Sequence, residues 1–541
     1  MVLAGFALAL SVTYPARAQF DDLRVEMSNL LEFQIGRDFS SEEDERERFF
    51  DQFIMDIYPT ADIRIGLRVE RFQDSPPPEL FGFPTDEYEY DRLAQRFVEW
   101  SMPHGTFRLG NSYAILGSGL IFRSFELPGV VRQTLFPIVS YAESRDLDGA
   151  VFEGWYGPVE VTVLHGTPVT NPDAAPDQAR QERRSGSVTG GRAMLRVVDG
   201  LRVGGSVLRG DGLEPGQTTS DRVELGGAEL DVEPFALVEG LEVPVYVRTQ
   251  IEYASRSWQP FQGGFGTATG KAHALYTNTQ VSWSSGALGV ETKDYHLFRL
   301  GVNDPPTLVP EFTHRLLNRT THVLDPLDER GHQVTLGQSL PSWMGGGSVE
   351  VVHARSKARR ELLPGTFDDA LRYEQDFVAI ESDPMRTWRA RAYFSDGQDE
   401  TEDLDTIRTV GLFVSSQLPR ELAVELDVGH QVRDRKGLGD ASADRSEDIA
   451  IVAALSKAGL GQVGVLWERT DDPEFQDDPL TDEVETDPRT FLGATVSWRV
   501  NAHHDVTVFT GKRRGGVACT SGTCYIVPDF EGTELRISSR F

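Results

Sequence analysis

Runs of residues in which apolar and polar side chains alternate strictly limit what this chain can fold into more than any other feature. Such runs occur at 63–70, 388–394, 422–429 and 492–500. A β-strand turns alternate side chains to opposite faces, whereas an α-helix repeats every ~3.6 residues. The runs therefore predict strands that each have one apolar and one polar face, which indicates an all-β fold.

The connectors between these runs fall into two classes that alternate along the chain. Tight turns, such as 156–157 and 284–286, alternate with long connectors, such as 167–186 and 471–488. This alternation is typical of a transmembrane β-barrel, whose turns and loops lie on opposite sides of a membrane. We predict a single large antiparallel transmembrane barrel over residues 19–541, with roughly 24 strands and a range of about 22–26.

The run at 531–541 continues to the last residue of the chain. The last strand of a closed barrel must pair with the first, so this end must be a strand. The spacing of Gly532, Leu535, Ile537 and Phe541 resembles the C-terminal assembly signal of bacterial outer-membrane barrels, and Phe530 departs from it. The resemblance implies outer-membrane lipid and the barrel-assembly machinery as partners.

Residues 1–18 have the features of a secretory signal peptide. An apolar stretch precedes Ala16-Arg17-Ala18, which is a small-x-small cleavage site. A buried N-terminal strand is the alternative interpretation. An exported chain of this pattern is expected in the outer membrane.

Charge and motifs exclude several function classes. The chain has 84 acidic and 53 basic residues and a net charge of −31, so it should repel nucleic acid. The acidic residues concentrate in connectors such as 42–47 and 399–403; calcium could bind there, although solvated charge explains them more simply.

No nucleophile elbow, phosphate-binding loop or metalloprotease motif occurs in the chain. We expect no enzyme activity, cofactor or metal, although a catalytic set assembled in space at the rim stays open.

The two cysteines, Cys519 and Cys524, are close together in a long connector. In an exported protein such a pair favours a local disulfide. A metal or redox pair is the alternative, but no histidine or second cysteine pair lies near enough to complete a zinc site.

Several charged residues fall on the polar faces of the predicted strands and should point into the lumen. They are Arg64, Arg68, Arg389, Arg391, Glu425, Asp427 and Arg499. Opposed charges in a wet lumen can set the electric field of a pore. Alternatively, they pair across neighbouring strands and only satisfy a polar interior.

The stretch at 107–149 breaks the regular pattern. Glycines at 117 and 119 and the pair Pro128-Gly129 suggest bends, and irregular polar backbone is not tolerated against lipid. We expect 117–146 to fold inward as a constriction. Its candidate constriction residues, together with one just beyond it, are Arg123, Arg132, Asp146 and Asp148, and Glu126, Glu143 and Arg145 are also charged.

The stretches 107–149 and 515–541 together resemble an uncharacterised family of bacterial outer-membrane barrels, a domain of unknown function. The resemblance implies the fold and the location but no activity. We expect a porin-like passage or binding of an unidentified solute through a partly plugged lumen. A structural barrel that anchors other envelope or surface components without transport is the alternative.

Overall fold

The computed structural model describes residues 23–37, 46–75, 79–80, 83–84, 89–128, 142–169, 186–211, 222–238, 244–257, 272–296, 298, 302, 305–308, 312, 314–320, 322, 328–358, 361–363, 366–367, 371–383, 385–435, 444–472, 489–520, 523–527 and 530–541. The signal peptide expected at 1–18 and the predicted lumen residue Arg132 lie outside these residues.

Twenty-four strands form one sheet. They are β1 (Arg24–Arg37), β2 (Arg46–Thr60), β3 (Ile63–Ser75), β6 (Glu89–Met102), β7 (Gly105–Ser112), β11 (Leu147–Tyr156), β12 (Val159–Pro168), β13 (Val188–Val198), β14 (Leu201–Asp211), β15 (Arg222–Val232), β16 (Val245–Ser257), β17 (Ala272–Trp283), β18 (Gly286–His296), β19 (Asp328–Ser339), β20 (Ser348–Ala358), β23 (Leu371–Glu381), β24 (Trp388–Asp399), β25 (Leu404–Leu418), β26 (Leu422–Arg435), β27 (Asp444–Lys457), β28 (Gly461–Thr470), β29 (Arg489–Arg499), β30 (His504–Arg513) and β33 (Phe530–Arg540).

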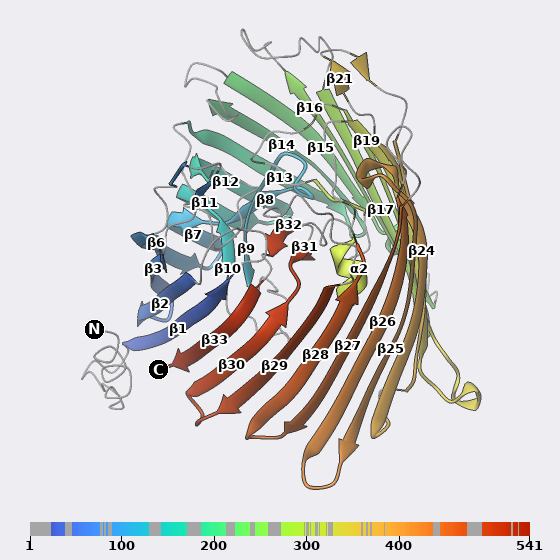
Figure 1. The fold of residues 1–541 in the computed structure, drawn as a ribbon. Coiled ribbons are helices and arrows are strands. Elements are labelled where there is room, and N and C mark those ends of the chain that lie inside the picture. Colours follow the sequence, from blue (N-terminus) through green and yellow to red (C-terminus); the bar gives the residue numbers. More distant parts are fainter. Residues whose placement is uncertain are drawn as a thin grey trace.

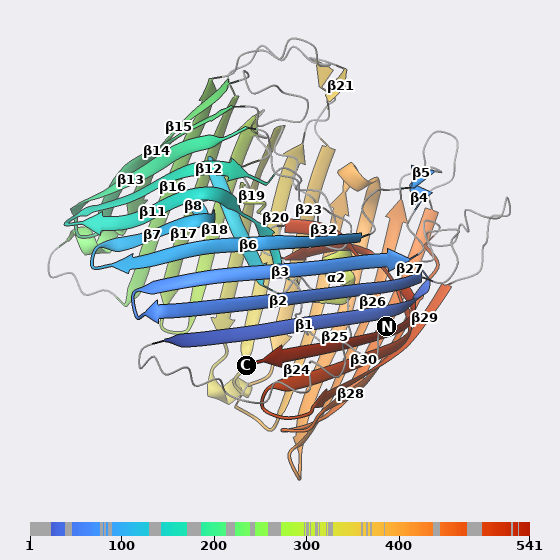
Figure 2. The same ribbon diagram turned by 90° about the vertical axis from the view of Figure 1, so that its left-hand side faces the viewer.

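Each of these strands pairs antiparallel with the next one along the chain, and β33 pairs with β1 to close the ring (Figure 1). Figure 2 shows the end of the chain beside β1. The predicted all-β single barrel is therefore confirmed, as is its strand number.

The two faces of the wall differ in the way that the alternating runs predict. On β28, Val463 and Val465 face outward and are 51% and 45% exposed. Leu466 and Glu468 lie on the other face and are buried. An outer face of exposed aliphatic side chains is what lipid contact requires.

Shorter elements occupy the connectors. They are β4 (Glu79–Leu80), β5 (Phe83–Pro84), β8 (Ala114–Leu116), β9 (Phe122–Pro128), β10 (Ala142–Arg145), β21 (Glu361–Leu363), β22 (Thr366–Phe367), β31 (Gly516–Thr520), β32 (Thr523–Val527), α2 (Arg315–Arg319), η1 (Pro234–Leu237), η2 (Ser342–Met344) and η3 (Glu400–Glu402). At the turn side, the connectors 233–244 and 340–347 are longer than the tight turns, and each contains a 3-10 turn. Within the described residues, no helix has the length and apolar character needed to cross a membrane.

Glycines allow close approach where the barrel closes. Gly532 is paired with Gly36 on one side and with Gly511 on the other. A Cβ atom on Gly532 would lie 2.1 Å from the carbonyl oxygen of Ile35. The last residue also belongs to this seam, because the Phe541 N–H donates to the Met27 carbonyl at 2.8 Å.

Candidate functional site

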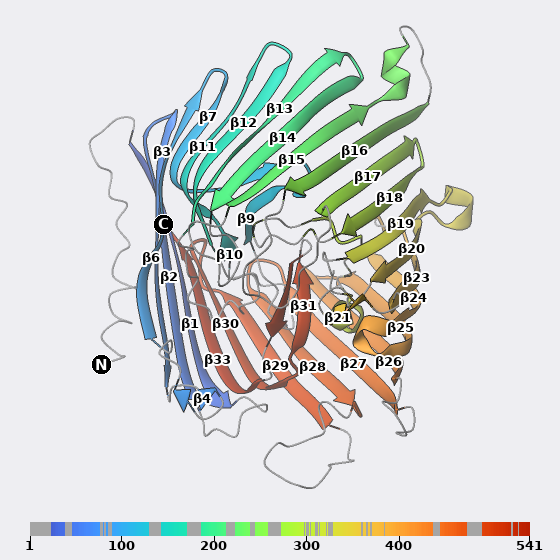
Figure 3. The ribbon, with the colours of Figure 1, turned by 90° about the horizontal axis from the view of Figure 1, so that it is seen from above.

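Among the described residues, three parts of the chain leave the wall and lie inside the barrel (Figures 1 and 3). The first inner segment is described at 113–128 and 142–146 and contains β8, β9 and β10. The second is described at intervals from 298 to 322 and contains α2. The third, at 514–527, contains the β31–β32 hairpin.

A sharp bend carries the first inner segment onto the wall at β16. Gly117 and Gly119 have φ angles of +69° and +96°, which confirms the bend expected there. The backbone N–H and the hydroxyl of Ser118 both donate to Glu252 Oε2, at 2.6 and 2.5 Å. A Cβ on Gly117 would lie 2.2 Å from the same carboxylate, so glycine permits this approach.

Apolar packing holds this bend in place. Leu116, Leu120 and Ile121 are each 0% exposed. They belong to one cluster with inward-facing residues of β11–β18, including Leu164 and Leu208. Burying a side chain of this size contributes about 1.5–3 kcal/mol, so several together outweigh the polar contacts of the bend.

An ion pair also joins β9 of the first inner segment to β3 of the wall. Arg68, predicted to face the lumen, is 4% exposed on β3 and pairs with the Glu126 carboxylate of β9. The Tyr113 hydroxyl donates to Glu126 Oε2 at 2.8 Å. Burial alone would raise the pKa of Glu126, but the charge of Arg68 and these hydrogen bonds hold it below its usual range.

The other predicted residues of this stretch have local roles. Asp146 accepts a hydrogen bond from the Asn111 amide, and Asp148 Oδ2 lies 3.4 Å from Arg96 Nη2. The Arg123 N–H donates to the Val302 carbonyl at 3.1 Å, which joins the first and second inner segments.

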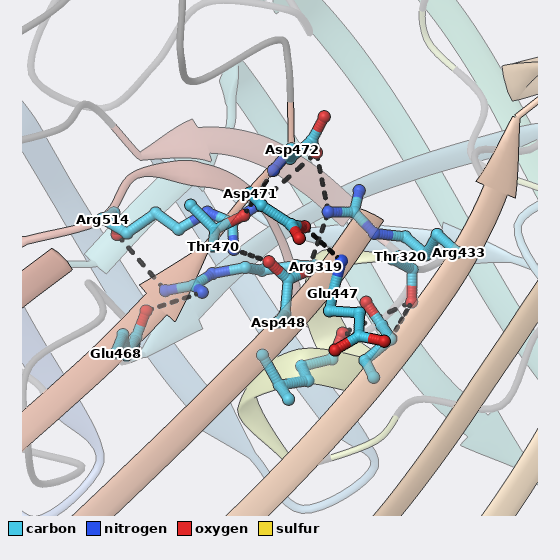
Figure 4. Close-up of polar contacts among 12 residues, drawn as sticks. Arg319, Thr320, Arg433, Glu447, Asp448, Glu468, Thr470, Asp471, Asp472 and Arg514 are labelled. Carbon is cyan, nitrogen blue, oxygen red and sulfur yellow. Dashed lines mark hydrogen bonds and ion pairs between the residues drawn. The ribbon is translucent and has the colours of Figure 1, made fainter. Parts of the chain in front are cut away.

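The second inner segment docks on β28 through two arginines of α2, of which Figure 4 labels Arg319. Arg315 and Arg319 are four positions apart, so they lie on one face of the helix. Both reach the carboxylate of Glu468, at 2.7 and 2.8 Å. Glu468 is 2% exposed, which leaves this carboxylate dependent on the two guanidinium groups.

The same network continues along the inner face of β26 and β27. Arg433 Nη2 lies 2.7 Å from Asp448 and 2.6 Å from Asp472. Arg514, which begins the third inner segment, lies 2.7 Å from Asp448 Oδ1. Arg319 also donates to the Arg514 carbonyl at 3.4 Å, so one network joins both segments to the wall.

A second buried network lies just beyond α2, at His322. Lys293 Nζ lies 2.5 Å from Glu329 Oε1, and both side chains are 0% exposed. His322 places Nδ1 2.8 Å from Asp399 and Nε2 3.4 Å from Glu329. The imidazole stacks on Tyr373 with 4.4 Å between ring centroids.

The two histidines of this segment have opposite protonation behaviour. Burial alone would lower the pKa of His322, but its hydrogen bonds with Asp399 and Glu329 raise it to about 9. His314 stacks on Tyr393 at 3.8 Å. Burial, helped by the charge of Arg391, lowers the pKa of His314 to about 4. At neutral pH His322 is therefore charged and His314 is neutral.

The remaining predicted lumen arginines face carboxylates on nearby strands. Arg64 lies 2.9 Å from Asp56, Arg389 2.5 Å from Glu381, Arg391 2.8 Å from Glu350, and Arg499 3.2 Å from Asp505. This is the arrangement of the alternative interpretation, cross-strand pairing. Glu425 is exposed and Asp427 is partly buried.

Sequence reasoning missed most of the residues that anchor the second inner segment. Four of them occupy inward positions of strands in which apolar and polar residues alternate: Lys293, Glu329, Asp448 and Glu468. The odd or even position of a residue along a strand, which we call strand parity, could therefore have placed them on the inner face. The segment around His322 has no periodicity, and nothing in its sequence indicates which carboxylates it meets.

The cysteines lie in the third inner segment, whose strand β31 contacts α2. Cys519 is directly opposite Cys524 in the register of the β31–β32 hairpin. The disulfide stays a prediction.

A possible metal-binding group lies on the outer face instead of the lumen. His353, Glu374 and Asp376 place ligand atoms within 4.8 Å of one another on β20 and β23. His353 Nδ1 already pairs with Asp376 at 2.8 Å, so we interpret the group as cross-strand ion pairing.

No protein-family model and no curated protein matches the chain. It is similar to a solved E. coli P pilus tip assembly intermediate, PapC-PapD-PapK-PapG, with 10% identity and a TM-score of 0.49 over 97% of this chain and 62% of that chain. It is also similar to the P pilus usher (PapC) translocation pore, with 10% identity and a TM-score of 0.40 over 96% of this chain and 99% of that chain.

Pseudomonas aeruginosa OpdK, solved with vanillate, is similar with 9% identity and a TM-score of 0.40 over 73% of this chain and 98% of that chain. At these identities and TM-scores the likenesses carry no conclusion about function. The resemblance to an uncharacterised family likewise stays a prediction.

Proposed function

We propose that the protein is an outer-membrane barrel whose partly filled interior passes or binds a solute. The observation that carries the proposal is the opposite character of the two faces of the wall. The outer face exposes aliphatic side chains such as Val207, 64% exposed, and the inner face carries ion-paired residues such as Arg68 and Glu468. Such a wall suits lipid outside and a polar interior inside.

Export and assembly belong to the same proposal. Residues 1–18 act as the signal peptide, and Gly532, Leu535, Ile537 and Phe541 are recognised by the barrel-assembly machinery. The pairing of Phe541 with Met27 in the closing seam supports this role, because loss of the last residue would shorten that seam. The protein has no enzymatic role in this proposal.

The test is single-channel recording of the purified, folded protein in planar bilayers. Steady conductance is the expected result. A barrel that shows the heat-dependent gel shift of a folded barrel but no conductance and no solute binding would contradict the proposal.

A scaffold barrel is the second candidate, and one observation favours it. The anchors of the second inner segment, Lys293 and Glu329, are 0% exposed, as expected for a permanent filling of the interior. A folded barrel that shows no conductance but retains envelope components during purification would support this role.

A further inference from the structure

A row of three cationic side chains lies on the outer face of the barrel, at the long-connector end of β19, β20 and β23. Arg330 is directly opposite Lys357, and Lys357 is directly opposite Arg372. All three are exposed, and they alternate with buried inward neighbours, as Lys357 does with Ser356 and Ala358. We call these three residues the cation row.

The cation row is costly without an anion. Directly opposite side chains on neighbouring strands have Cβ atoms about 4.5–5.5 Å apart, and like charges there are destabilising. Arg330 has one carboxylate, Asp294, at 3.1 Å, and Glu400 binds the backbone N–H of Arg372 at 2.8 Å. In the described part of the chain, Lys357 has no ion-pair partner.

Composition does not explain the row, because the chain as a whole has a net charge of −31. Acidic residues outnumber basic ones, so three adjacent cations in register are unexpected by chance. Arginine and lysine side chains placed side by side are the groups with which proteins bind phosphate.

Toward the tight-turn end of β19, β20 and β23, the outer face becomes apolar. A register row of aliphatic residues, Leu336, Val351 and Val378, faces outward there, with Val351 and Val378 38% and 42% exposed. Lys357 lies about 20 Å farther along the strand than Val351, at ~3.4 Å per residue. With a usual tilt of ~40°, this is about 15 Å along the membrane normal. Two outward rows that contain the pairs Arg355–Glu374 and His353–Asp376 lie between the cation row and the aliphatic row. The separation is about half the ~30 Å thickness of a hydrocarbon core.

We propose that the cation row binds phosphate groups of lipid headgroups in the leaflet on the long-connector side. Arginine holds a phosphate through paired N–H donors, and lysine adds a compact charge between the two arginines. A lipid also has acyl chains that can lie on the aliphatic row, whereas free phosphate has none. The inference rests on the membrane insertion in the proposed function and is independent of solute passage.

The test uses full-length folded protein, delipidated in a neutral detergent and titrated with phosphatidylglycerol or phosphatidylcholine. Bound lipid is counted by native mass spectrometry. The row variant carries Arg330→Gln, Lys357→Gln and Arg372→Gln. The matched control carries Arg37→Gln, Arg408→Gln and Arg445→Gln, which removes the same charge from outward cations that each face a carboxylate.

We expect the wild type and the control to prefer phosphatidylglycerol, and the row variant to lose about fivefold in affinity for each cation removed. Inorganic phosphate should compete poorly. The proposal is wrong if both triple variants lose affinity equally, if the wild type has no preference, if oleate binds as well as phosphatidylglycerol, or if inorganic phosphate displaces the lipid at equal concentration.

Two controls separate this test from the proposed function. The heat-dependent gel shift shows whether each variant is folded, and bilayer recording shows whether it conducts. A row variant that folds and conducts like the wild type but loses the lipid preference supports the inference alone. A folded wild type that is silent in bilayers but keeps the preference contradicts only the passage of a solute.

Discussion

The first and second inner segments both pack on apolar residues of the wall, but the second also docks through the ion-pair network around Glu468. The first rests on β11–β18 through Leu116, Leu120 and Ile121, with an apolar cluster beneath it. The second contributes residues 298, 302 and 308 to the same cluster and residues 312 and 317 to another. Its helix α2 adds the buried ion pairs of Arg315 and Arg319 with Glu468. Apolar packing is insensitive to pH, whereas buried charges depend on every partner.

The difference shows that the inner face of the barrel is not uniform. At the same inward positions, β12 and β14 carry Leu164 and Leu208, whereas β27 and β28 carry Asp448 and Glu468. The wall therefore selects which segment binds where. The contacts of each inner segment with the wall should therefore be weakened by a different perturbation.

The largest effect is expected for Glu468→Ala. It leaves Arg315 and Arg319 without their carboxylate, and breaking a buried pair from one side costs about 3–5 kcal/mol. Hydrogen exchange of peptides from 312–322 should become much faster while those from 114–122 stay protected.

Glu447→Ala is the control, because Glu447 faces outward on the neighbouring strand and is partly exposed. Equal exchange in the two variants would show that the Glu468 network does not hold the second segment.

The converse change is Ile121→Ala in the first inner segment. Removing a fully buried aliphatic side chain costs about 2–5 kcal/mol, because a cavity remains. Exchange should accelerate at 114–122 and not at 312–322. Ile115→Ala, at a position 47% exposed in the same segment, should have little effect. Loosening of both segments together would mean that they dock as one unit.

Titration of His322 and His314 should act on the second segment, because both histidines belong to it. The pKa of His322 is raised to about 9 from its ordinary value near 6.5, so its contribution is present below pH 6.5 and lost as pH rises through 9. The shift corresponds to about 3 kcal/mol. The pKa of His314 is lowered to about 4, so docking also weakens as pH falls from 6.5 toward 4.

Docking of the second segment should therefore be most stable near pH 6.5. Exchange corrected for its intrinsic pH dependence would show this maximum, and His322→Gln should remove the alkaline limb only. A flat profile for the wild type would contradict the assigned protonation states.

The smallest effect concerns the third inner segment. Closing the short ring between Cys519 and Cys524 should stabilise the hairpin by about 2 kcal/mol in the chain-entropy model. Thiol reagents should leave unreduced, unfolded protein unlabelled and modify both cysteines after reduction. Labelling without reductant would show that no disulfide exists.

Much of the barrel could be predicted from the sequence, because period-2 alternation and connector rhythm are local signals. Strand parity placed Arg68 and Arg64 on the inner face, where the structure has them. Parity does not show that Arg68 meets Glu126 or that Glu468 meets α2. These contacts join residues far apart in sequence, and only closure of the ring brings them together.

The inward bend could also be predicted from the sequence, because its signal is local. Gly117 and Gly119 mark a turn that other residues would strain, so the sequence identifies its position. The second inner segment has no comparable mark. Its location depends on the depth of Glu468, Glu329 and Asp399 within the finished barrel, which no short stretch encodes.

Single-channel recording of a protein lacking residues 124–142 tests most directly whether the inner segments narrow a solute passage. The deletion removes Glu126 and its link to Arg68 but leaves the barrel strands intact. We predict a sharp rise in conductance, with the heat-dependent gel shift of a folded barrel retained. Unchanged conductance in a folded deletion protein would contradict the account and place any constriction elsewhere.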